Sequence, residues 1–117
     1  MEKSFIIEAP GNGKVSHTIS IYNMDARVRA GTEIMRVRTT LSKRVKAGTR
    51  AMTYVGRPYN NKFWDNKKYA GNMNCSQLVW AAYKSATGID LDGDGGKGVY
   101  LRDIKKSSWT YTYAYVQ

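Results

Sequence analysis

The sequence has little of several residues that small proteins use to staple a fold or bind a metal. Its 117 residues include one cysteine, one histidine and two prolines. A single cysteine cannot form an intramolecular disulfide, so the chain is not a disulfide-stapled mini-protein. One cysteine and one histidine also fall short of the four ligands of a structural zinc site. We therefore expect neither a metal nor a cofactor.

Long apolar runs are also missing. No uncharged stretch approaches the roughly 20 residues that a membrane-spanning helix needs. The first ten residues carry Glu2, Lys3 and Glu8 and lack the pattern of a signal peptide. We expect a protein that either stays inside the cell or is exported by a signal outside this chain.

Acidic residues are scarce. Nine Asp and Glu stand against nineteen Lys and Arg, for a net charge of +10. Residues 34–64 contain no acidic residue and eight basic ones: Arg36, Arg38, Lys43, Arg44, Lys46, Arg50, Arg57 and Lys62. This asymmetry favours an anionic partner such as nucleic acid, anionic lipid or wall polymer. A solvated basic surface explains it as well, because no nucleic-acid motif accompanies the charge.

The length fits one domain over residues 1–117, and 42% of the residues are hydrophobic, which is enough to fill a core. Alternating or β-branched runs predict strands at 4–9, 15–22, 33–37 and 109–116. Helical spacing predicts one helix over about 41–55, with Ser42 as N-cap, and a second from Cys75 to about Ser85. The first helix has an apolar stripe made of Leu41, Val45, Gly48, Met52 and Val55. This order predicts the α+β class, with an antiparallel sheet packed against two main helices.

Cys75 is the first candidate for chemistry. It begins the second predicted helix, where Asn72 or Asn74 can act as N-cap and Gly88 ends the helix. At a helix N-terminus, the backbone N–H groups and the helix dipole favour a thiolate and can hold an oxyanion. A buried structural thiol is the alternative, because free cysteine is often buried.

The residues around Cys75 carry a family resemblance. They are Gly56-Arg57-Pro58-Tyr59, then Asn74-Cys75-Ser76-Gln77-Leu78-Val79-Trp80, and then Asp90-Leu91-Asp92 with Gly95-Gly96. This pattern resembles the papain-like cysteine peptidases of the NlpC superfamily. Within them it is most similar to the circularly permuted amidohydrolases related to lecithin retinol acyltransferase. The resemblance implies a permuted papain-like fold and a Cys75 nucleophile that cleaves amide or ester bonds.

The permuted branch places its catalytic histidine before the cysteine, and His17 is the only histidine in the chain. Two alignments remain open. In the first, His17 is the base and Glu33 orients it. In the second, the strand ending in Glu8 matches the family's second strand, so that Glu8 is the orienting acid. The family's histidine strand then lies upstream of Met1, and His17 is a bystander. The second alignment fits the spacing to the strand at 33–37 better.

The resemblance also suggests the remaining roles. The Cys75 N–H, with Tyr59, would hold the oxyanion or contact substrate, although Tyr59 could equally be a packed aromatic residue. Asp90, Asp92 and Asp94 with Gly95 match the start of a calcium loop, but Leu101 stands where the bidentate Glu belongs. We interpret that segment as a turn-rich connection.

The sequence therefore predicts a cysteine hydrolase that cleaves amide or ester bonds through the Cys75 thiolate, with cell-wall peptide as a candidate substrate. The alternative is a catalytically incomplete accessory or binding module of the same fold, which recognises an anionic polymer through its basic stretch. The substrate, the oligomeric state and the export route are left open.

Overall fold

The strands form two separate antiparallel pairs. The computed structural model describes residues 5–8, 17–20, 33–69, 71–92 and 95–115. Strand β1 (Phe5–Glu8) pairs with β2 (His17–Ser20), and β3 (Glu33–Val37) pairs with β4 (Thr110–Tyr115). All four strands lie within the predicted ranges. The α+β class with antiparallel pairing is confirmed, but within the described residues the strands divide between two sheets instead of forming one.

Helix α1 (Leu41–Met52) is where the prediction was wrong about the buried face. Its N-cap is Thr40, whose hydroxyl accepts from the Lys43 N–H at 3.2 Å, and not Ser42. The face that packs on α2 carries the buried Ala47, while Leu41 of the predicted apolar stripe is 70% exposed. The other large residues of that stripe, Val45, Met52 and Val55, are exposed as well. Small side chains allow α1 to lie close to α2, so the larger residues point elsewhere.

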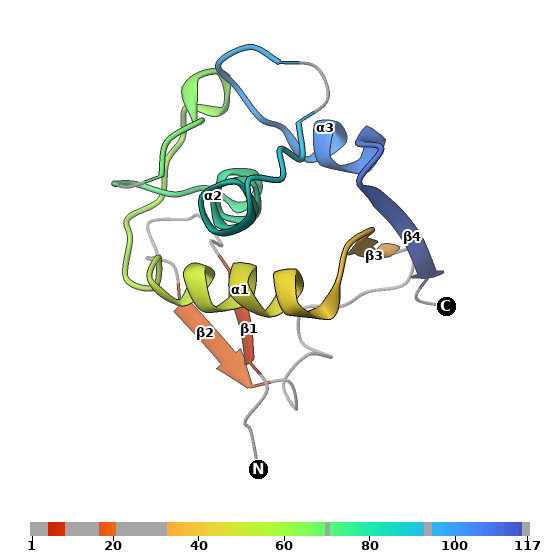
Figure 1. Cartoon of the computed structure of the whole chain (residues 1–117). Helices are drawn as coiled ribbons and strands as arrows, with labels where there is room; N and C mark the ends of the chain where they lie inside the picture. The colour runs from red at the N-terminus through yellow and green to blue at the C-terminus, as the bar shows by residue number, and fades with distance from the viewer. Residues whose placement is uncertain (1–4, 9–16, 21–32, 70, 93–94, 116–117) are drawn as a thin grey trace.

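Helix α2 (Cys75–Thr87) is the centre of the core. Figure 1 shows it between α1 and the segment that leads to α3. Its buried side chains include Leu78, Trp80, Ala81 and Ala82. They pack with Val37, Tyr54, Met73, Ile89, Leu91 and Val99. The helix ends at Gly88, whose φ of 78° lies in the left-handed region that glycine adopts at a C-cap.

Two short elements were not predicted. The 3₁₀ turn η2 (Phe63–Asp65) lies between α1 and α2, and helix α3 (Leu101–Lys106) precedes β4. Asp103 caps α3 by accepting the Tyr100 N–H at 2.8 Å. At Gly98 the chain runs so close to η2 that a Cβ atom would lie 2.4 Å from the Phe63 carbonyl oxygen. That contact joins the glycine-rich loop to η2 and leaves no room for a side chain.

Within the described ranges, no helix is long and apolar enough to cross a membrane.

Candidate active site

Cys75 is the first residue of α2, as predicted, and its side chain is half-buried. Asn74 is the N-cap and forms a capping box with Gln77. The Asn74 Oδ1 accepts the Gln77 N–H at 3.0 Å, and the Gln77 Oε1 accepts the Asn74 N–H at 3.4 Å. This reciprocal pair fixes the backbone on both sides of the thiol, so Cys75 starts the helix in a defined orientation.

Among the described residues, nothing brings the pKa of this thiol below its ordinary value. Burial raises the pKa of Cys75 above its ordinary value, and hydrogen bonds from the Ser76 and Cys75 backbone N–H groups oppose that rise. Desolvation is the larger effect, so the thiol form dominates at neutral pH. The backbone N–H groups at the helix N-terminus do lower the Cys75 pKa, as expected, but burial raises it by more, so the net pKa is not lowered. A nucleophilic Cys75 needs a base.

Tyr59 lies in the electrostatic field of Cys75. Its segment runs beside Met73 through a parallel bridge, with the Met73 N–H donating to the Pro58 oxygen at 2.8 Å and the Asn60 N–H to the Met73 oxygen at 3.0 Å. Burial raises the pKa of Tyr59, and negative charge on Cys75 raises it further. The Tyr59 hydroxyl is therefore neutral at neutral pH.

A buried amide network holds the loops around Cys75, and sequence reasoning missed its most important member. Asn66 is fully buried. Its Nδ2 donates to the Val99 oxygen at 2.8 Å and to the Asn74 Oδ1 at 3.1 Å, while its Oδ1 accepts the Val99 N–H at 2.6 Å. The Ser76 hydroxyl also donates to the Val99 oxygen, at 2.7 Å. Asn66 thereby connects the segments before and after α2 at the residues that flank Cys75.

Gln77 makes the second half of this network. Its Oε1 accepts from the Asn60 Nδ2 at 2.9 Å, and its Nε2 donates to the Lys68 oxygen at 3.1 Å. Gln77 is fully buried, so these bonds replace water for a polar side chain in the core. The 57–74 segment is therefore held at several points and is not a loose loop.

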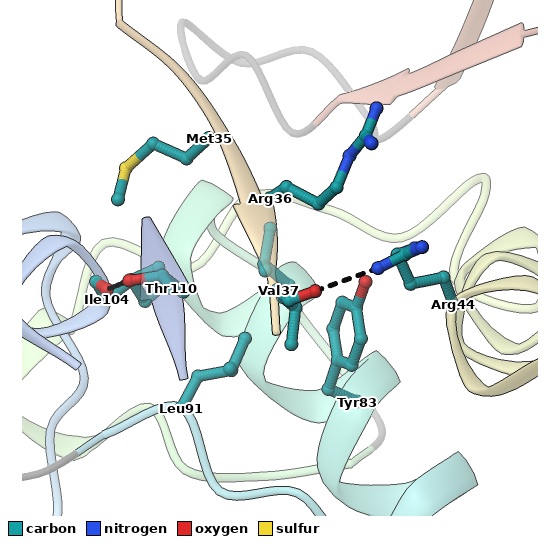
Figure 2. Close-up of a pocket in the computed structure, with 9 residues that line it drawn as sticks. Met35, Arg36, Val37, Arg44, Tyr83, Leu91, Ile104 and Thr110 are labelled. Carbon is teal, nitrogen blue, oxygen red and sulfur yellow. Dashed lines mark hydrogen bonds between the residues drawn. The ribbon is translucent and has the colours of Figure 1, made fainter. Parts of the chain in front are cut away.

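A cavity of about 350 Å³ lies along α2 beyond Cys75. Val79 and Tyr83, four and eight residues after Cys75, line it together with Leu91 and residues of β3 and β4. Figure 2 shows Tyr83 beside Arg44, whose Nη1 donates to the Val37 oxygen at 3.0 Å. Val79 is 38% exposed, so α2 does not bury all of its large apolar side chains.

The aspartate loop has a structural role in the described residues. The Asp90 Oδ1 accepts the Trp80 Nε1–H at 2.9 Å and the Asp92 N–H at 3.0 Å. Asp92 is buried and forms an ion pair with Lys67. Asp94, the third residue of the calcium-like pattern, lies outside the described residues. Among the residues with described positions, no group of three or more His, Cys, Asp and Glu side chains could hold a metal ion.

The strand register gives the backbone positions of the candidate base, His17, and of the candidate acids, Glu8 and Glu33. Glu8 and His17 are directly opposite each other in the β1–β2 pair. Glu33 pairs with Tyr115 in the other sheet, so the two candidate acids relate differently to His17. The side chains of all three residues lie outside what the structure describes. The roles of His17 and Glu8 stay predictions.

A thiol at the first position of a buried helix, with backbone N–H groups turned toward its sulfur and a neutral tyrosine nearby, is the nucleophile arrangement of cysteine hydrolases. Residues 1–108 match the family described as the permuted papain-like amidase enzymes YaeF/YiiX, the C92 family. The chain belongs to this family, and the resemblance inferred from its motifs is confirmed.

One curated protein and one solved structure are similar to this chain. The chain is 41% identical over 81 residues to the uncharacterised protein YycO of Bacillus subtilis, an alignment that covers 68% of this chain and 33% of YycO. It therefore spans about a third of the length of that relative. The crystal structure of the metalloprotein yiiX from Escherichia coli O157:H7 superposes with a TM-score of 0.71. That match covers 97% of this chain and 76% of yiiX at 18% sequence identity, so the fold is the permuted papain-like one.

Proposed function

We propose that this chain is a cysteine amidase in which Cys75 is the nucleophile. The observation that carries the proposal is the half-buried thiol at the first position of α2, held by the Asn74–Gln77 capping box in a family of amidases. A nucleophile on a rigid helix end keeps its sulfur in one position relative to the N–H groups beside it. That geometry suits attack on a carbonyl carbon.

The catalytic steps follow from these residues. A base takes the Cys75 proton, and the thiolate attacks the amide carbonyl to form a tetrahedral oxyanion. The Cys75 N–H and the neutral Tyr59 hydroxyl donate to that oxyanion. The base then protonates the leaving amine as the C–N bond breaks, which leaves a thioester on Cys75. Water hydrolyses the thioester, and the thiol is regenerated.

His17 with Glu8 is our candidate for base and orienting acid, since they are register partners on adjacent strands. The other candidate is a histidine on a strand that is not part of this chain, with residues 1–117 forming one papain-like domain that lacks it. The open cavity beside Val79 and the division of the strands into two sheets support this second candidate. An added strand would find room beside the Cys75 helix.

Amine release separates these candidates. The protein is incubated with cell-wall stem peptides and with simple N-acyl amides, and free amine is measured by a fluorogenic reagent. We expect release by the unchanged protein and none by Cys75→Ala, with Ser85→Ala as a matched control on the exposed side of α2. Loss of activity in His17→Gln identifies the base. Full activity in that variant excludes His17, and release by Cys75→Ala refutes the proposal.

A binding module for an anionic wall polymer is the second candidate function, and one observation favours it. Of the four acidic residues whose side chains are described, Asp90, Asp92 and Asp103 are engaged in internal contacts, and only Asp65 is substantially exposed. Basic residues also outnumber acidic ones by nineteen to nine in the chain, and this excess of positive charge suits an anionic polymer. Polymer binding that falls steeply with salt, in a protein that releases no amine, would favour this function.

A further inference from the structure

Five residues of η2 and the start of α3 line a second, open hollow on the surface. Phe63, Trp64, Tyr100, Leu101 and Arg102, here called the aromatic face, line an open hollow of about 510 Å³. Trp64 is 64% exposed and Leu101 is 60% exposed. Large apolar side chains gathered at one place on a surface commonly mark an interaction site.

The backbone under the aromatic face is held by several contacts, so its exposed side chains have defined positions. Gly98 packs against the backbone of Phe63 and Trp64, and Asn66 binds both polar backbone groups of Val99. The rings of Phe63 and Tyr100 stack with centroids 5.9 Å apart. The two exposed residues therefore stand on a rigid base formed by η2 and the start of α3.

Positive charge surrounds the aromatic face. The Arg102 guanidinium lies 4.6 Å from the centroid of the Tyr100 ring, and Lys62 and Lys97 on the adjoining segments are exposed. Asp65 is the acid in η2, and it forms an ion pair with Lys68 at 3.6 Å. A protruding Trp and Leu with long cationic side chains beside them match the boundary between lipid headgroups and acyl chains. There the apolar groups leave water and the cations reach anionic phosphates.

We propose that the aromatic face binds the surface of an anionic phospholipid bilayer, with Trp64 and Leu101 entering the headgroup region. The charge distribution favours this partner over a neutral surface. The shallow shape favours a broad surface over an enclosed small ligand. The inference does not depend on Cys75 chemistry, because Cys75 is not among the residues that line the hollow.

The test uses the full chain with vesicles of phosphatidylcholine, with and without phosphatidylglycerol, in sedimentation at low and high salt. We expect strong binding to the anionic vesicles and a residual, salt-resistant part. In Trp64→Ala/Leu101→Ala, that affinity falls by roughly tenfold or more, because two apolar side chains no longer leave water. Trp109→Ala and Leu41→Ala are matched controls at other exposed positions, and both should bind as the unchanged protein does.

Fluorescence gives a second, site-specific readout. Lipids brominated near the headgroup should quench the emission of Trp64, and Trp64→Phe should remove that quenching while Trp80 and Trp109 remain. If Trp64→Ala/Leu101→Ala binds vesicles as the unchanged protein does, the proposal is wrong and charge alone explains the binding. If the unchanged protein self-associates without lipid and this variant does not, the aromatic face contacts a second copy of the chain and the proposal is also wrong. Cys75→Ala should bind vesicles normally, so failure here is separable from failure of the amidase proposal.

Discussion

Replacing Asn66 by alanine should destabilise the protein strongly although no apolar contact of note is lost. The side chain makes three hydrogen bonds and is fully buried. Three bonds contribute about 1 kcal/mol each, and the stranded Val99 N–H adds a desolvation cost of about 1 kcal/mol or more. We expect the free energy of unfolding to fall by roughly 3 to 4 kcal/mol, which lowers the melting temperature by roughly 10 to 25 °C.

Urea unfolding followed by circular dichroism measures this change, with alkylation of the Cys75 thiol as a local probe. Asn61→Ala is the matched control, since Asn61 is exposed, and its effect should lie within about 0.5 kcal/mol. Alkylation of Cys75 should accelerate in Asn66→Ala, because the segments on both sides of the thiol lose a common partner. A loss below about 1 kcal/mol, or one no larger than that of the control, would refute the role assigned to the network.

Three further predictions use single sites. Gly98→Ala should lower the free energy of unfolding by about 1 to 3 kcal/mol, because the new Cβ meets the backbone of η2. Gly48→Ala, in open space on α1, should instead raise it by about 0.5 to 1 kcal/mol. Calorimetry of the two variants measures both changes. Because burial raises the Cys75 pKa, alkylation of the native thiol should still be climbing with pH where that of the unfolded chain has levelled off, and coinciding profiles would contradict this. Since Cys75 negative charge raises the Tyr59 pKa, Cys75→Ala should lower the pH of Tyr59 ionisation in an ultraviolet titration.

Local patterns predicted the start and end of α2 well, and tertiary contacts explain where the predictions for α1 failed. Asn74, Cys75 and Gly88 are start and stop signals within one helix, so their positions follow from neighbouring residues. The buried face of α1 does not follow from neighbouring residues. It is set by the packing of α2, which buries Ala47 and leaves the larger Leu41 exposed. Periodicity identifies an apolar stripe but not what lies against it.

The amide network shows a different limit. Asn66 contacts Val99, which is 33 positions later in the chain, so no local signal distinguishes it from the exposed asparagines nearby. The motif pointed to Cys75 and Tyr59, whose roles stay predictions, but no local pattern pointed to the buried amides that hold the segments around them. The pairing of Glu8 with His17 depends on strand register, which the sequence left open between two alignments.

The pairing of β3 with β4 has a consequence for how the molecule is made. Val37 and Thr110 are register partners 73 positions apart, so the β3–β4 sheet closes only after β4 has been synthesised. Closing so long a loop costs entropy before any pairing is gained, which slows that step. During synthesis α1 and α2 leave the ribosome first, and β3 waits with an unpaired edge for its partner. That edge is where aggregation would compete with folding, so a nascent chain stalled before β4 should need a chaperone more than the finished one does.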